Sequence, residues 1–231
     1  RDDFTRGTLQ LSYMWKFFAS KTMIFQSGIP GASVIKFVNI TKSDEFEAKL
    51  NSLNDLFLLN SYSNQFIWQD WKFTFEYNIR EKENRKGNAQ VYFKSSFDPA
   101  GNIFALFKKH QDTLDNGQKA IFGIGYAQFA RLDNKLIVSK PLRKEKSLNF
   151  KVDIGAGLPY GNTATSMPYD YSFFGGGAND IRGWRARALG PGSYKYYLDL
   201  TRTATQIGDL GISASAEFRF PISSLIKSAI F

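Results

Sequence analysis

Apolar and polar residues alternate regularly through several segments of this chain, and this alternation constrains the fold more than any other feature. A period of two places successive side chains on opposite faces of a β-strand, whereas one face of a helix repeats about every 3.6 residues. In the clearest example, Leu148, Phe150, Val152 and Ile154 alternate with polar or small residues. The pattern predicts strands with one apolar and one polar face over residues 8–17, 71–80, 147–158 and 211–220.

Weaker forms of the pattern predict further strands over residues 89–98, 103–108 and 119–139. The last segment is long, and most of its apolar residues from Phe122 to Val138 occupy even-numbered positions, which share one face of a strand. Strands in globular sheets rarely exceed about ten residues, so this length favours a barrel strand that extends beyond a bilayer. Residues 43–60 instead carry apolar side chains at helical spacing, which predicts a short helix in a connection between strands.

The chain carries no apolar run of the length that a membrane-spanning helix needs, about 20 residues. Its mean hydropathy is −0.31, and aromatic residues make up 16% of the 231 residues. Both values suit a transmembrane β-barrel, whose strands present one apolar face to lipid and one polar face to the lumen. The composition therefore excludes a helical membrane protein and leaves a barrel open.

A soluble β-sandwich that acts as a binding module would also alternate, so the character of the polar face has to discriminate. Here that face is rich in glycine, serine and amide residues, with isolated charges such as Asp153, Glu217 and Arg219. Such a face suits a wet but crowded lumen better than bulk water. Aromatic residues near the expected strand ends fit interfacial girdles: Trp68, Trp71, Tyr77, Phe97, Tyr160 and Tyr169.

Charge and residue usage exclude several kinds of site. The formal net charge is +9, but no recognised nucleic-acid motif accompanies it, so nucleic acid is not an expected partner. The chain has no cysteine, which excludes disulfides and thiolate metal sites, and we expect no metal or other cofactor. The single histidine, His110, lies in a polar stretch without an orienting partner, so we expect no enzyme activity.

Residues 173–194 concentrate glycine and arginine between two expected strands. Glycine reaches backbone angles that are closed to other residues, so such a loop can fold back through a confined space. We expect it to deliver the Arg182 side chain to a fixed point, with Arg185 and Arg187 as supporting charges. From the residues alone, ordinary turn glycines and an exposed Arg182 are the favoured interpretation, and only the order of motifs described next reverses it.

The order of motifs in the C-terminal part resembles the loop-six signature of the Omp85 superfamily. The signature is carried by Gly175, Gly176 and Gly177, then Ile181, Arg182, Gly183 and Trp184, then Gly190, Pro191 and Gly192. The segment 159–162 upstream and the segments 208–209 and 216–221 downstream also resemble this family. The specific likeness covers about residues 119–231, and it is closest to the BamA- or TamA-like proteins of the Bacteroidetes type.

The resemblance implies an all-β fold, a transmembrane antiparallel barrel of sixteen strands with a long inward-folded loop. Residues 1–231 would be an interior part of one such barrel domain, without the periplasmic POTRA domains and the final strands. In the family the loop arginine pairs with a lumen carboxylate, and Glu217 occupies the matching position for Arg182. The alternation agrees, because Glu217 shares the polar parity with Ser213, Ser215 and Arg219. Asp153 and Arg219 are further candidate lumen charges.

The resemblance also implies a function, namely assembly, insertion or translocation of outer-membrane proteins by a non-enzymatic barrel. The expected partners are nascent outer-membrane proteins, the lipid bilayer, the POTRA domains of the same chain and accessory lipoproteins. The expected location is the outer membrane of a Gram-negative bacterium. The alternative is an outer-membrane porin or transport channel, which would share the barrel but lack the sequence signature of the inward loop.

Overall fold

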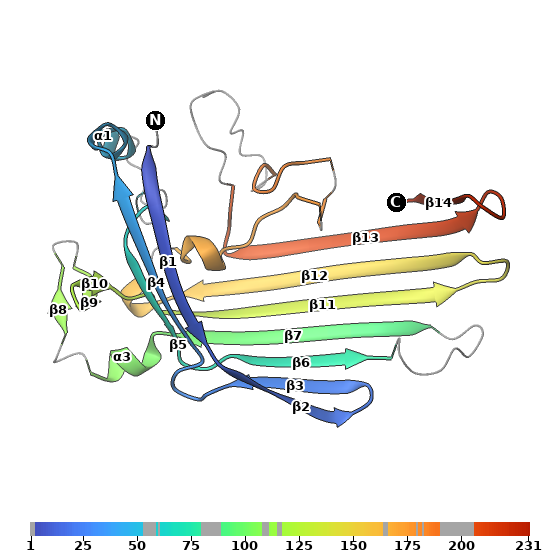
Figure 1. The fold of residues 1–231 in the computed structure, drawn as a ribbon, viewed down its shortest axis with the longest axis horizontal. Coiled ribbons are helices and arrows are strands. Elements are labelled where there is room, and N and C mark those ends of the chain that lie inside the picture. Colours follow the sequence, from blue (N-terminus) through green and yellow to red (C-terminus); the bar gives the residue numbers. More distant parts are fainter. Residues whose placement is uncertain are drawn as a thin grey trace.

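The computed structural model describes residues 3–52, 59, 61–79, 89–107, 111–114, 117–163, 166–178, 180–181, 183–189 and 206–231. Within these residues the chain forms one antiparallel sheet of eleven strands and a small sheet of three (Figure 1). The large sheet comprises β1 (Phe4–Ser12), β2 (Met14–Ser20), β3 (Met23–Gly28), β4 (Val34–Lys42), β5 (Gln65–Gln69), β6 (Phe73–Asn78), β7 (Gln90–Ala100), β11 (Phe129–Pro141), β12 (Ser147–Pro159), β13 (Leu210–Pro221) and β14 (Lys227–Ile230). The small sheet comprises β8 (Asp112–Thr113), β9 (Lys119–Ile121) and β10 (Ile124–Gly125).

The large sheet is a meander in which each strand pairs with the next one along the chain. Three of its strands are bent and are each assigned as two: β1 continues into β2, β3 into β4, and β5 into β6. The regular half consists of β7, β11, β12 and β13, which run side by side in Figure 1. β11 and β12 pair from Phe129↔Pro159 to Pro141↔Ser147 without a break in register. The all-β antiparallel fold expected from the alternation, a partial barrel, is confirmed.

Hydrogen bonds fix the bend in the three long strands. The Ser33 hydroxyl accepts the Lys72 N–H at 2.9 Å, and the Ser33 carbonyl accepts the Tyr13 N–H at 3.3 Å. The indole N–H of Trp68 donates to the Gly31 carbonyl at 2.6 Å, which ties the second bent strand to the third. Because all three strands bend at one level, β1 and β4 cross the regular half at a steep angle (Figure 1).

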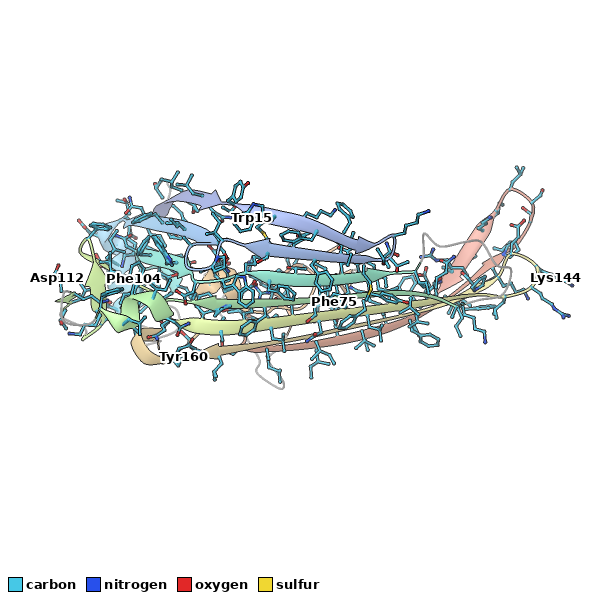
Figure 2. The ribbon with its side chains drawn as sticks, turned by 90° about the horizontal axis from the view of Figure 1, so that it is seen from below. Trp15, Phe75, Phe104, Asp112, Lys144 and Tyr160 are labelled. Carbon is cyan, nitrogen blue, oxygen red and sulfur yellow. The ribbon has the colours of Figure 1, made fainter. Side chains whose placement is uncertain are left out.

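The two faces of the sheet differ as the alternation predicts. One face, here called the outer face, carries large exposed apolar side chains, including Leu132, Leu136, Phe150, Ile154, Leu158 and Ile212. The opposite face, here called the inner face, carries the residues between them on the same strands, including Arg131, Asp133, Lys135, Lys151 and Asp153. In Figure 2 side chains extend from both sides of the long sheet.

One end of the sheet is covered by the long connection between β7 and β11. This connection contains α3 (Asn102–Leu106) and the three-stranded sheet, and Figure 2 places Phe104 and Asp112 at that end and Lys144 at the other. Phe104 packs against Phe66, Trp68 and Tyr126, with ring centroids 5.1 to 5.6 Å apart. The aromatic residues therefore join this connection to the bent strand β5, and Trp68 lies inside this cluster rather than in a girdle.

Two of the predicted strands are wrong. Residues 103–108 were expected as a strand, but α3 occupies Asn102–Leu106, because the buried carboxylate of Asp70 accepts the N–H groups of Asn102 and Ile103 at 2.8 and 3.1 Å. The expected strand 119–139 is divided into β9, β10 and β11. Phe122 and Gly123 both have positive φ, 53° and 73°, so the chain turns between β9 and β10.

The predicted helix over 43–60 is present as α1 (Asp44–Ser52), and residues 53–58 lie outside the described residues. Its first turn carries Asp44, Glu45 and Glu47, whose negative charges interact favourably with the positive end of the helix dipole. The N–H of Phe46 donates to the Ser43 hydroxyl at 3.3 Å, as expected for an N-terminal cap. None of the described helices is both long and apolar enough to span a membrane.

Candidate functional site: an inward loop on the inner face

The described part of the connection between β12 and β13 returns over the inner face of the sheet. The Phe173 ring lies on Gly155 of β12 and Gly211 of β13, and a Cβ atom at Gly211 would come within 2.9 Å of the Phe173 Cβ. Phe173 also exchanges two backbone hydrogen bonds of 2.8 Å with Gly208. Glycine is needed at these two wall positions because a side chain there would occupy the space that the Phe173 ring fills.

A small apolar core seals the first part of this loop against the wall. Met167 is 2% exposed and packs with four buried wall residues, Ile67, Ala100, Ala127 and Phe129, while Tyr171 packs at the edge of this cluster. Met167 also lies close to the wall at β12, since a Cβ atom on Gly157 would lie 2.9 Å from the Met167 Cε. The segment 166–173 is therefore a packed part of the fold.

Between these apolar contacts, Asp170 forms an ion pair with two strands at once. Its Oδ2 atom accepts hydrogen bonds from Arg6 of β1, at 2.7 Å, and from Lys36 of β4. Burial alone would raise the pKa of Asp170, but the hydrogen bonds and charges of Lys36 and Arg6 outweigh burial and lower the pKa below its usual value. Burial, with the nearby charges of Asp98 and Asp170, raises the pKa of the Tyr171 hydroxyl well above its usual value.

The glycine-rich motif that follows forms a hairpin-like excursion of its own. Gly175 bridges to Leu189, the Gly177 N–H donates to the Trp184 carbonyl at 2.9 Å, and the Gly176 N–H donates to the Asp180 carboxylate at 3.0 Å. Gly176 has φ of 89°, and a Cβ there would collide with the Arg185 carbonyl, so this position requires glycine. The tip is open, with Ile181 43% and Trp184 56% exposed.

Arg187 joins this excursion to the packed segment. Its guanidinium lies over two rings, 4.7 Å from the centroid of Tyr169 and 4.3 Å from that of Phe174. Contacts of this kind contribute about 0.5–2 kcal/mol, depending on exposure. Tyr169, which we expected in an interfacial girdle, therefore lies within the inward loop, where it also faces Arg6 at 5.7 Å.

The remaining predicted site residues fall into two groups. Arg182, Gly190, Pro191 and Gly192 lie outside the described residues, as does His110. Glu217 and Arg219 lie on the inner-face parity of β13, opposite Asn149 and Ser147, and bind each other at 2.8 Å. The pairing of Arg182 with Glu217 stays a prediction.

A cavity of about 950 Å³ lies between the loop and the inner face. Ile181 lines it from the loop, and Ser213 lines it from β13; Glu217 stands four residues further along the strand, about 13 Å away. Asp153, predicted as a lumen charge, lines the same cavity and pairs with Lys151 at 2.7 Å. Arg131 pairs with Asp133 at 2.9 Å and faces the Phe173 ring at 4.5 Å.

The cavity wall carries both apolar and charged side chains, and three of its acids are paired with neighbouring cations, namely Asp98 with Lys72, Asp133 with Arg131 and Asp153 with Lys151. Within the described residues no group of three or more metal-ligating side chains comes together. Paired charges of this kind suit a water-filled lumen braced by side chains.

Three residues of this site were not predicted from the sequence, namely Met167, Asp170 and Tyr171. The only signal for Asp170 was an isolated acid between two aromatic residues in a stretch without periodicity. Its partners lie 134 and 164 positions away along the chain, so no local pattern could have paired them.

Comparison with known families gives one finding. The model of the Omp85 superfamily domain matches residues 42–231, a range that runs from the end of β4 through the inward loop to the last residue. It thus covers more of the chain than the motifs around the loop alone. A search of the curated proteins found no match.

Proposed function

The chain belongs to the Omp85 superfamily, and we propose that it forms part of a barrel that inserts nascent proteins into an outer membrane. The family as a whole comprises outer-membrane proteins that assemble or translocate other proteins. The finer assignment, a BamA- or TamA-like factor of the Bacteroidetes type, is part of this proposal. So are its partners, which would be nascent outer-membrane proteins, the bilayer, POTRA domains and accessory lipoproteins.

The observation that carries the proposal is the inward loop. A segment with the glycine-rich family motif packs on the inner face through Met167 and Phe173, rather than extending from the rim. A barrel that only conducts solutes does not need a loop seated in this way. A barrel that deforms the bilayer and offers a strand edge as a template needs its wall braced from inside while the edge is open.

The proposed mechanism involves no covalent step. The outer face carries exposed apolar side chains for contact with lipid, and strand edges supply unpaired backbone groups to an incoming strand. The loop would hold the wall in shape, with Arg182 paired to Glu217 in the lumen. An arginine–carboxylate pair fits this role because its two parallel hydrogen bonds fix orientation as well as distance.

The experiment uses the full-length protein in a strain that depends on it. We expect Arg182→Ala and Glu217→Ala each to lower the level of outer-membrane proteins, whereas Arg143→Ala, at the exposed turn between β11 and β12, leaves it unchanged. Heat-modifiable gel mobility checks that the variants still form a folded barrel. Normal levels in both loop variants would contradict the assembly function, and large, steady single-channel currents would favour a transport channel instead.

A further inference from the structure

We propose that Asp170 is a positioning residue that anchors the inward loop to β1 and β4, so that one short segment joins the two ends of the sheet across the inner face. This inference rests on the proposed function, because it assigns the residue that would hold the loop in place during assembly. It concerns a different contact from the motif arginine and its carboxylate on β13.

The first step is the geometry of the anchor. One carboxylate oxygen of Asp170 accepts from both Arg6 and Lys36, whose side chains are 27% and 12% exposed. The Lys36 ammonium also lies 5.7 Å from the centroid of the Tyr171 ring. A lysine this buried needs a compensating charge, because an unpaired ammonium in such a position loses hydration without replacement.

The second step is the place of the anchor in the sheet. β1 stands at one end of the strand order, and β12 and β13 stand near the other end, with β4, β5, β7 and β11 between them. The segment 167–173 touches both ends, through Asp170 on β1 and β4 and through Met167 and Phe173 on β12 and β13. An ion pair in the middle of this segment therefore acts across the inner face and not along one strand.

The third step links the anchor to the glycine-rich motif. Tyr169, next to Asp170, is shared by Arg6 from the wall and Arg187 from the motif. The Arg187 backbone N–H donates to the Gly175 carbonyl at 3.0 Å, so a shift of this arginine moves the base of the excursion. The Tyr169 ring would thus transmit a loss of the Asp170 contact to Arg187 and the motif.

The test uses a single introduced cysteine, because residues 1–231 contain none; any cysteine elsewhere in the full-length protein is first replaced by serine. Ser172 is 5% exposed and follows Asp170 by two residues. The nearly isosteric thiol of Ser172→Cys therefore becomes accessible only when this segment leaves the wall. In the full-length protein in outer-membrane vesicles, we expect this thiol to react slowly with a maleimide. Asp170→Asn should raise the rate about tenfold, the low end for loss of a hydrogen bond to a charged group.

Two further variants separate positioning from general damage. Asp112→Asn removes an exposed carboxylate from β8 and should leave the labelling rate at the parent value. Lys36→Met combined with Asp170→Asn should raise the labelling rate by less than the product of the two single effects, as a direct coupling requires. Heat-modifiable mobility should be the same in all variants.

The inference is overturned if Asp170→Asn labels at the parent rate, or if the effects of Lys36→Met and Asp170→Asn on the labelling rate multiply as independent changes do. The labelling rate does not depend on the insertion of other outer-membrane proteins. If the loop loosens in Asp170→Asn while outer-membrane protein levels stay normal, the anchor stands and the proposed assembly function is what fails.

Discussion

The two halves of the inward loop obtain their order from different sources. Residues 166–173 are packed, with Met167 and Ser172 at 2% and 5% exposure. The described residues between 175 and 189 belong to the predicted glycine-rich motif. Their tip is open, and backbone hydrogen bonds and glycine geometry hold them in shape. Among the described residues, the contacts that fix the loop to the wall come from the segment 166–173, whereas the described residues of the glycine-rich motif mainly contact one another. Four predictions test this division, from the largest expected effect to the smallest.

The first prediction contrasts burial in the two halves. Met167→Ala should destabilise the seat of the loop by about 2–5 kcal/mol, because it leaves a cavity among Ile67, Ala100 and Phe129. Trp184→Ala, at the exposed tip, should cost less than about 0.5 kcal/mol. Maleimide labelling of the Ser172→Cys thiol in each background measures the difference. Equal labelling in the two variants would remove the distinction between packed and open halves.

The second prediction concerns the space that glycine leaves on the wall. Gly155→Val places atoms where the Phe173 ring lies and should cost about 1–3 kcal/mol by overpacking. Adding Phe173→Ala should relieve part of that cost. Gly208→Ala is the control, since the nearest atom to its new Cβ would be 3.7 Å away. The three variants are compared by urea titration of the folded barrel, and a Gly155→Val variant as stable as Gly208→Ala would argue against the Phe173 contact.

The third prediction uses the titration of Asp170. Its folded pKa lies below the unfolded value of about 3.9, so the anchor contributes fully above that value and is lost as pH falls through the folded pKa. The charged groups facing it are Arg6 from β1 and Lys36 from β4. In the Ser172→Cys protein, the rate at which the introduced thiol reacts with a reagent that works at low pH should rise below about pH 4. In Asp170→Asn this step should be absent; a step that persists would assign it to another carboxylate.

The fourth prediction has the smallest expected effect. Arg187→Leu should weaken the link between the halves by about 1 kcal/mol through loss of the two ring contacts. Arg185→Leu, an exposed neighbour in the same excursion, should have no effect. Limited proteolysis between residues 175 and 189 reports on this link. Faster cleavage in both variants would point to a general effect of charge.

Alternation predicted the regular half of the sheet well, and the reason is visible in β12 and β13. Both strands have one face toward the loop and lumen and one apolar face along their whole length, so the alternation is not interrupted. The predicted strands 147–158 and 211–220 therefore end within one residue of the observed ends. The bent strands β3, β4 and β5 were not predicted. Buried polar residues at the bends, Ser33 and Asp70, interrupt the alternation of apolar and polar residues along these strands.

The site was predictable only where it follows a local rule. The glycines of the motif could be located because their spacing is read along the chain, and Gly176 does adopt a positive φ. Asp170 could not be located, because its role depends on Arg6 and Lys36, which only the tertiary fold brings near. Likewise, α3 displaced a predicted strand because Asp70, more than thirty positions earlier, supplies the carboxylate that caps it.

One measurement tests the position of the loop most directly. Phe173→Cys and Gly211→Cys, introduced together into the full-length protein, should form a disulfide on mild oxidation in the membrane, since their Cβ atoms would start 2.9 Å apart and need to separate by less than about 1 Å. Ser139→Cys with Asn149→Cys, neighbours on β11 and β12, is the positive control for access of the oxidant. A cross-link in both pairs is the predicted result. A control pair that cross-links while the Phe173–Gly211 pair stays reduced would place the loop away from the inner face and contradict the account.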